Sequence, residues 1–203
     1  MRQTQTRTRT GEVTLRELAE MLHDTEELQK ALDRDEYTCK FKPFVTSADR
    51  AVDFITSNAN KHLVIANTDP GSLPGTHWVL FFARNSFHPA IFFDSYGKKT
   101  STHFKGWQQF DSRRRNKQEL QQEHTSVCGD YCLYVVRQAS AGYSLQSILE
   151  KNFNPQDKDN NGELVYFLVH SRFKFLNKTK HKNVEDRQYK SCQSCKPRNR
   201  LNK

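Results

Sequence analysis

The chain lacks any long hydrophobic run, and hydrophobic residues make up only 35% of its 203 residues. No apolar stretch approaches the roughly 20 residues that a membrane-spanning helix needs, so we expect no membrane contact. No apolar signal region opens the chain, and its five cysteines are an odd number. Both features argue against a secreted disulfide framework and favour an intracellular location.

Charge is unevenly distributed along the chain. Residues 1–10 contain three arginines and no acid, and residues 174–203 contain ten Lys or Arg against two acids. These ends carry +3 and +8 of the formal net charge of +9, which leaves −2 for residues 11–173. We therefore expect a basic, disordered arm over 1–10, one domain over 11–173 and a basic, flexible tail over 174–203. The basic ends either bind DNA by counterion release or only keep the chain soluble, and charge alone does not separate these alternatives.

The first part of the domain shows helical periodicity. A capping box at 14–17, followed by apolar residues at helical spacing, predicts a helix over about 14–23. A second helix is expected after Asp24, with one apolar face made of Leu28, Ala31 and Leu32. A third is expected after Ser47, with its apolar face made of Ala48, Ala51, Val52 and Ile55.

The middle of the domain changes character. Three short runs of aromatic and branched residues, bounded by turn residues, lie at 63–67, 77–83 and 90–96. This pattern predicts strands, and their near-continuous apolarity predicts that both faces of the sheet are covered. Residues 85–89 are expected to join the second and third strands as a hairpin.

Helices are expected again after a polar segment at 98–124. One begins at Cys128, is apolar most of the way round and therefore buried, and ends near Gly142. A short helix at 145–149, a loop at 154–162 and a last helix over 164–173 complete the domain. The order helices, strands, helices predicts an α+β fold with a central mixed sheet flanked by helices.

A cysteine, a histidine and an acid stand at the ends of these predicted elements. Cys128 begins a helix, whose dipole and free N–H groups lower a thiol pKa, and the adjoining glycine would let the backbone approach a substrate. His77 opens one strand as the candidate base, and Asp94 closes the next, where it could orient the imidazole. The Cys128 N–H and the amide of Gln121 or Gln122 could stabilise an oxyanion. The arrangement predicts thiolate attack on a peptide carbonyl, which is the chemistry of a cysteine endopeptidase.

Each of these residues also has a structural interpretation. A buried cysteine near aromatic residues usually serves packing, and Cys132, one helical turn after Cys128, is expected to be structural. Asp94 could be a turn former. The chain uses histidine freely, at His23, His62, His88, His103, His124, His170 and His181. Only the joint arrangement of His, Asp, Gln and Cys favours catalysis.

Three segments carry a resemblance to a known family. Gly-Thr-His77-Trp, Phe-Phe-Asp94-Ser-Tyr-Gly and Val-Cys128-Gly-Asp-Tyr-Cys, with a Gln before the last, resemble the adenovirus-type cysteine proteases (adenain) and the proteases of Polinton/Maverick elements. That group is similar in fold to the SUMO-specific proteases. The resemblance covers about 63–140 and implies an α+β, papain-like cysteine protease in permuted order. It implies His77 as base, Asp94 as orienting acid and Cys128 as nucleophile.

The resemblance also implies a glutamine in the oxyanion hole. The adenain spacing selects Gln121, whereas the SUMO-protease spacing selects Gln122. Val127 stands where SUMO proteases usually have Asp before the nucleophile, which favours Gln121. Residues 41–45 are only a loose counterpart of the family's Gly-rich segment before the first strand.

The implied substrates are viral or transposon-encoded structural precursors of capsid or core, cleaved by a monomer in the host nucleus and virion. The sequence requires no cofactor, although the resemblance implies activation by DNA through the basic ends. Two alternatives stay open: a deconjugating protease for a ubiquitin-like modifier, and a non-catalytic basic DNA-binding or packaging protein. Cys192 and Cys195 have zinc-knuckle spacing, but no second pair exists, so a redox-sensitive tail is preferred and no metal site is expected.

Overall fold

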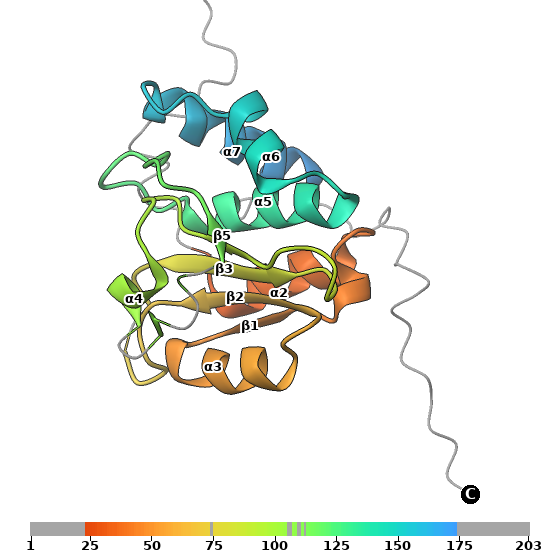
Figure 1. Ribbon diagram of the computed structural model, residues 1–203. Coiled ribbons are helices and arrows are strands. Elements are labelled where there is room, and N and C mark those ends of the chain that lie inside the picture. Colours follow the sequence, from red (N-terminus) through yellow and green to blue (C-terminus); the bar gives the residue numbers. More distant parts are fainter. Residues whose placement is uncertain (1–22, 74, 105–106, 109–110, 112, 174–203) are drawn as a thin grey trace, which may run out of the picture.

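The computed structural model describes residues 23–73, 75–104, 107–108, 111 and 113–173. The described part is an α+β structure built on a five-stranded mixed sheet (Figure 1). The strands, in both chain and sheet order, are β1 (Phe44–Thr46), β2 (His62–Asn67), β3 (Trp78–Ala83), β4 (Ile91–Phe93) and β5 (Arg114–Arg115). The α-helices of the described residues are α2 (Thr25–Arg34), α3 (Ala48–Ser57), α4 (Thr100–His103), α5 (Cys128–Ala141), α6 (Leu145–Asn152) and α7 (Lys158–Arg172).

Strand pairing puts the three predicted strands at the centre of the sheet. β2, β3 and β4 are antiparallel neighbours, so the hairpin expected between β3 and β4 is confirmed. β1 pairs in parallel with β2, and β5 pairs in parallel with β4. Every residue of the three central strands is buried, as their continuous apolarity predicts.

Helices cover both faces of the sheet (Figure 1). Alternate residues of β2, such as Leu63 and Ile65, enter the larger core with the apolar residues of α2 and α5. Their neighbours, such as Val64, enter a second core with Ala51 and Ile55 of α3. α6 and α7 lie beyond α5, on its side away from the sheet. The result is that α5 is enclosed between the sheet and two further helices.

Three predicted helices are confirmed. α2 follows Asp24, whose side chain accepts the N–H of Glu27 at 2.7 Å, and its apolar residues are buried. α3 follows Ser47, as expected, but the Ser47 side chain makes no capping hydrogen bond. α5 begins at Cys128 and ends before Gly142, whose φ of 117° is a conformation that glycine adopts without strain.

The boundary of the last helix was predicted wrongly. α7 begins at Lys158, inside the expected loop of 154–162. The Asp157 side chain accepts the N–H of Asn160 and caps the helix, and the buried Asn161 side chain bonds the backbone of Asn154. These polar contacts, rather than apolar periodicity, form its first turn.

Three short elements were not predicted. β1 has three residues, and α4 and β5 lie in the polar segment 98–124, for which no helix or strand was predicted. β1 pairs with β2 and β5 pairs with β4, so both short strands depend on a neighbouring strand and not on local propensity. The helix expected over 14–23 lies outside the described residues apart from His23, as do the basic ends 1–10 and 174–203. Within the described ranges, no helix is long and apolar enough to cross a membrane.

Candidate active site

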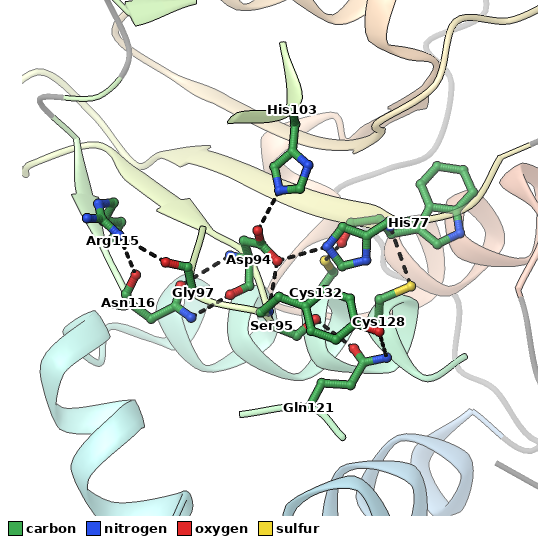
Figure 2. Close-up of polar contacts among 12 residues, drawn as sticks. His77, Asp94, Ser95, Gly97, His103, Arg115, Asn116, Gln121, Cys128 and Cys132 are labelled. Atoms are coloured by element: carbon green, nitrogen blue, oxygen red, sulfur yellow. Dashed lines mark hydrogen bonds and ion pairs between the residues drawn. The ribbon is translucent and has the colours of Figure 1, made fainter. Parts of the chain in front are cut away.

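The sheet brings His77 and Asp94 together. His77 directly precedes β3 and Asp94 directly follows β4, and the two strands are antiparallel neighbours with Leu80 opposite Phe93. The His77 Nε2 atom lies 2.8 Å from Asp94 Oδ1 (Figure 2). Because a carboxylate only accepts hydrogen bonds, Nε2 carries the proton and Nδ1 is left as an acceptor.

Cys128 lies beside this pair, at the start of α5. Its sulfur accepts the backbone N–H of Trp78, the residue after His77, at 3.4 Å. In Figure 2 the His77 ring is drawn between the Asp94 carboxylate and the Cys128 side chain, with its second nitrogen on the side of the cysteine. The structure therefore groups the three residues in the order acid, imidazole and sulfur.

The pKa of Cys128 differs from the sequence-based expectation. Burial raises the pKa of the thiol to about 12, although the N–H groups of Trp78 and Gly129 act in the opposite direction. Only 2% of the residue is exposed, so the cost of burying a thiolate exceeds the benefit of the helix N-terminus. At neutral pH the resting thiol is protonated and needs a base to become nucleophilic.

Gly129 has a packing role instead of the expected approach to substrate. It is buried, and a Cβ atom placed on it would lie 3.2 Å from Leu28 Cδ2 and 3.3 Å from His23 Cδ2. These contacts are tight, so a larger residue would require Leu28 or His23 to move by a few tenths of an ångström. The glycine thus allows the start of α5 to pack closely against Leu28 of α2 and against His23.

Asp94 is fully buried and both of its carboxylate oxygens accept hydrogen bonds. Oδ1 accepts from His77 and from the backbone N–H of Tyr96, and Oδ2 accepts from His103 Nε2 at 2.6 Å. Burial alone would raise the pKa of Asp94, but the hydrogen bonds and charges of His103 and His77 hold it well below its usual range. The carboxylate therefore stays ionised where it holds the His77 ring.

Asn116 fixes the backbone of Asp94. Its Oδ1 accepts the N–H of Asp94 at 3.1 Å, and its Nδ2 donates to the Asp94 carbonyl and to that of Gln118 (Figure 2). Asn116 reaches this position because it directly follows β5. Sequence reasoning missed both Asn116 and His103, since no periodic pattern marks either one in the segment 98–124.

The structure separates the two candidate glutamines. Gln121 is 1% exposed and lies in the site, where its Oε1 accepts the hydroxyl of Ser95 at 2.6 Å. Its Nε2 donates to the Thr125 carbonyl at 2.7 Å and to the Tyr96 hydroxyl at 3.2 Å. Gln122 is exposed. Both N–H groups of Gln121 have acceptors, so it can bind a substrate oxygen only by giving up one of them, and the contact with Tyr96 is the longer.

Two neighbours complete the surroundings of the site. The Tyr96 ring packs on His77 with a centroid distance of 4.8 Å. Burial, followed by the nearby Cys128 and Asp94, raises the pKa of Tyr96 to about 12, so its hydroxyl stays neutral. Cys132 is buried, and its thiol donates to the carbonyl of Trp78 at 3.5 Å. This contact fits the packing role expected for Cys132.

The chain was also compared with known proteins. No protein-family model matches it, and no curated protein sequence matches it. The interpretation of the site therefore depends on its geometry, together with the resemblance of the three motifs.

Proposed function

We propose that this chain is a cysteine endopeptidase in which Cys128 is the nucleophile, His77 the base and Asp94 the orienting acid. The observation that supports this most strongly is the hydrogen-bonded pair of His77 and Asp94 next to the sulfur of Cys128. The chain order His, Asp, Cys on two strands and a following helix supports a papain-like fold in permuted order. None of the three residues is exposed, so their polar groups are placed by the fold and not by solvent.

The reaction follows from the geometry. His77 Nδ1 takes the proton of the Cys128 thiol as the sulfur bonds to the substrate carbonyl carbon, whose oxygen becomes an oxyanion. Asp94 holds the ring and stabilises the imidazolium that forms. The C–N bond then breaks, and His77 returns its proton to the leaving amine. Water, deprotonated by His77, hydrolyses the thioester and releases the acid and the Cys128 thiol.

A base that acts during attack suits the neutral resting thiol. A thiol whose pKa is raised to about 12 contributes almost no thiolate at neutral pH. When the thiol proton moves to His77, the negative charge on sulfur forms next to a positive imidazolium, which ionised Asp94 stabilises in turn. The buried thiolate is therefore never without a neighbouring positive charge.

The oxyanion would be stabilised at the start of α5. The backbone N–H of Cys128 is at the helix N-terminus, where N–H groups have no acceptor within the helix. Gln121 Nε2 is the second proposed donor, after a shift from the Tyr96 hydroxyl to the substrate. The exposed Gln122 is not part of this proposal.

The substrate class is proposed from the motifs alone. Their similarity to adenovirus-type proteases supports cleavage of viral or transposon-encoded structural precursors by a monomer in the host nucleus and virion. The basic ends of the chain are proposed to bind DNA in the same setting. No cofactor is needed for the chemistry that the three residues can perform.

Peptide hydrolysis tests the proposed activity. The full chain is incubated with a proteome-derived peptide library, and new termini are identified by mass spectrometry. Cys128→Ala and His77→Ala are each expected to lower turnover at least about a thousandfold, since both residues act in one unit. Cys132→Ala is the matched control, a second buried cysteine on the same helix, and should retain activity. Undiminished turnover in Cys128→Ala or His77→Ala would refute the proposal.

Two further outcomes concern the alternatives. Labelling of Cys128 by a covalent probe built on a ubiquitin-like modifier would favour a deconjugating protease. Salt-sensitive DNA binding together with complete absence of hydrolysis would favour a non-catalytic DNA-binding protein.

A further inference from the structure

A second group of two histidines and one aspartate lies outside the proposed catalytic residues. His23 precedes α2, Asp130 is in the first turn of α5, and His170 is in the last turn of α7. All three are buried, with 5%, 0% and 4% of each residue exposed in that order. Three separate segments of the chain thus bring ligand-type side chains to one point in the interior.

The ligand-type atoms of this group are close enough to share one ion. Asp130 Oδ1 lies 2.9 Å from His23 Nε2 and 3.2 Å from His170 Nε2, and the ligand atoms of the three residues all lie within 4.8 Å of one another. Zinc at about 2.0–2.1 Å from each ligand in a tetrahedral arrangement requires ligand separations of about 3.3 Å. The two distances from Asp130 Oδ1 to the imidazole nitrogens, 2.9 and 3.2 Å, lie within a few tenths of an ångström of that spacing.

Comparison with the catalytic aspartate shows what is unusual about Asp130. His77, Asp94 and His103 form the same type of group, but there both carboxylate oxygens accept hydrogen bonds. In the second group, Asp130 Oδ2 is buried and has no hydrogen-bond partner among the described residues. A buried carboxylate oxygen without a partner is costly and rare, and a cation that Oδ2 binds together with Oδ1 would remove that cost.

The surroundings of the histidines resemble those of metal ligands. Glu27 Oε2 lies 3.4 Å from His23 Nδ1, the nitrogen that faces away from Asp130. A carboxylate on the far nitrogen of a coordinating imidazole is a common feature of metal sites, because it orients the ring and makes it a better ligand. The carbonyl of His23 accepts the indole N–H of Trp78 at 3.1 Å, and the Tyr166 ring packs on His170 with a centroid distance of 4.0 Å. Both imidazoles are therefore held in place.

We propose that His23, Asp130 and His170 bind one divalent transition metal ion, with zinc as the preferred ion. Two imidazole nitrogens and one carboxylate suit zinc, and water can supply its fourth ligand. Because the ligands are buried and come from three segments, the ion has a structural role: it joins the segment before α2 and the helix α7 to the first turn of α5. This proposal does not depend on proteolytic activity.

Metal uptake by the full chain tests the proposal. The protein, prepared without chelator, is expected to retain one equivalent of zinc by elemental analysis. After removal of the metal, cobalt(II) should give the visible absorption of a tetrahedral site that zinc then displaces. His170→Gln and His23→Gln should each weaken cobalt binding more than about tenfold, and zinc should raise the melting temperature of the wild type but not of these variants.

Three control variants locate the site. His88→Gln changes an exposed histidine, and His103→Gln changes the other His–Asp–His group. The double variant Cys192→Ser with Cys195→Ser removes the only Cys-x-x-Cys pair of the sequence. All three variants should bind cobalt as the wild type does. Zinc content and cobalt uptake of the wild type test the proposal even if a variant at His23 or His170 fails to fold. Absence of zinc and of cobalt uptake by the wild type overturns the proposal, as does uptake that survives His170→Gln and disappears in the double cysteine variant.

Discussion

The backbone N–H of Trp78 donates to the sulfur of Cys128 at 3.4 Å, so the strand that directly follows His77 also positions the Cys128 sulfur. The same tryptophan donates its indole N–H to the carbonyl of His23, and its own carbonyl accepts the Cys132 thiol. β3, α5 and the segment before α2 thus meet at one residue. The relative position of base and sulfur depends on packing in the core and not on a surface loop.

Gln121 and Gln122 provide a matched pair for testing the oxyanion donor. Gln121→Ala should lower kcat about 100- to 1000-fold, the usual effect of losing one such donor, with little change in KM. Gln122→Ala should leave the kinetics unchanged, because that side chain is exposed. The measurement is steady-state hydrolysis of one peptide cleaved by the wild type. Equal effects of the two substitutions would contradict the assignment.

His103 is expected to act as a positioning residue through Asp94. In His103→Ala, Asp94 Oδ2 loses its donor, and since a hydrogen bond to a charged group contributes about 1.5–3 kcal/mol, kcat should fall about 10- to 100-fold. His103→Gln keeps an N–H group and should recover most of the rate. Both variants are compared over a range of pH, because the loss of His103 should raise the pKa of Asp94 and change the acidic side of the profile. A purely structural role predicts unchanged pH profiles and no recovery by Gln.

Alkylation of Cys128 should need unusually high pH in the resting protein. Burial raises the thiol pKa to about 12, above the ordinary cysteine value of about 8.5, so the reactive thiolate becomes abundant only in strong base. Iodoacetamide modification of Cys128 is measured by peptide mass spectrometry at several pH values, with the same cysteine in the urea-unfolded chain as the comparison. The rate at Cys128 should still rise above a pH of about 9. A rate at Cys128 that levels off near neutral pH would show instead a thiolate formed before substrate binds.

His62 predicts a loss of stability in acid. Burial, followed by the charge of Arg113, lowers the pKa of His62 to about 4, and its Nε2 accepts from Arg113 while its Nδ1 donates to Asn58. Because the folded pKa lies below the unfolded value of about 6.5, the contribution is present above pH 6.5 and lost as pH falls toward 4. Acidification from about pH 7 to about 4.5 should therefore cost about 2–3 kcal/mol at this residue alone.

Urea unfolding at the two pH values measures this contribution. His62→Gln removes the titrating group and should lose less unfolding free energy over the same range than the wild type. His88→Gln, an exposed histidine, serves as the control and should lose as much as the wild type. Identical losses in all three proteins would show that His62 does not carry the effect.

The elements that the sequence predicts well are those whose apolar pattern is continuous. The three central strands are fully buried and α5 is mostly buried, so most of their residues are apolar, and only the end of β4 at Phe93 differs from the predicted 90–96 by more than one residue. The positions of His77, Asp94 and Cys128 at the ends of these elements follow from those bounds. The predicted strands at 77–83 and 90–96 and the predicted helix from Cys128 were thus enough to indicate that His77, Asp94 and Cys128 could lie close together.

The remaining features depend on contacts between distant segments. β5 has only two residues, and nothing in its sequence indicates that it pairs with β4 and delivers Asn116 to Asp94. His103 is one histidine among several, and only the fold shows which of them reaches the acid. The direction of the Cys128 pKa shift could not be predicted either, because it depends on how deeply the sulfur is buried.

The most direct test of the proposed mechanism is to trap the covalent intermediate. Wild-type protein is mixed with an excess of a cleaved peptide, quenched in acid within one turnover, and examined by intact and peptide mass spectrometry. The mechanism predicts a thioester on Cys128 whose mass matches the N-terminal product, and its absence in His77→Ala. Peptide cleavage by the wild type with no adduct at Cys128, or with an adduct at another residue, would contradict it.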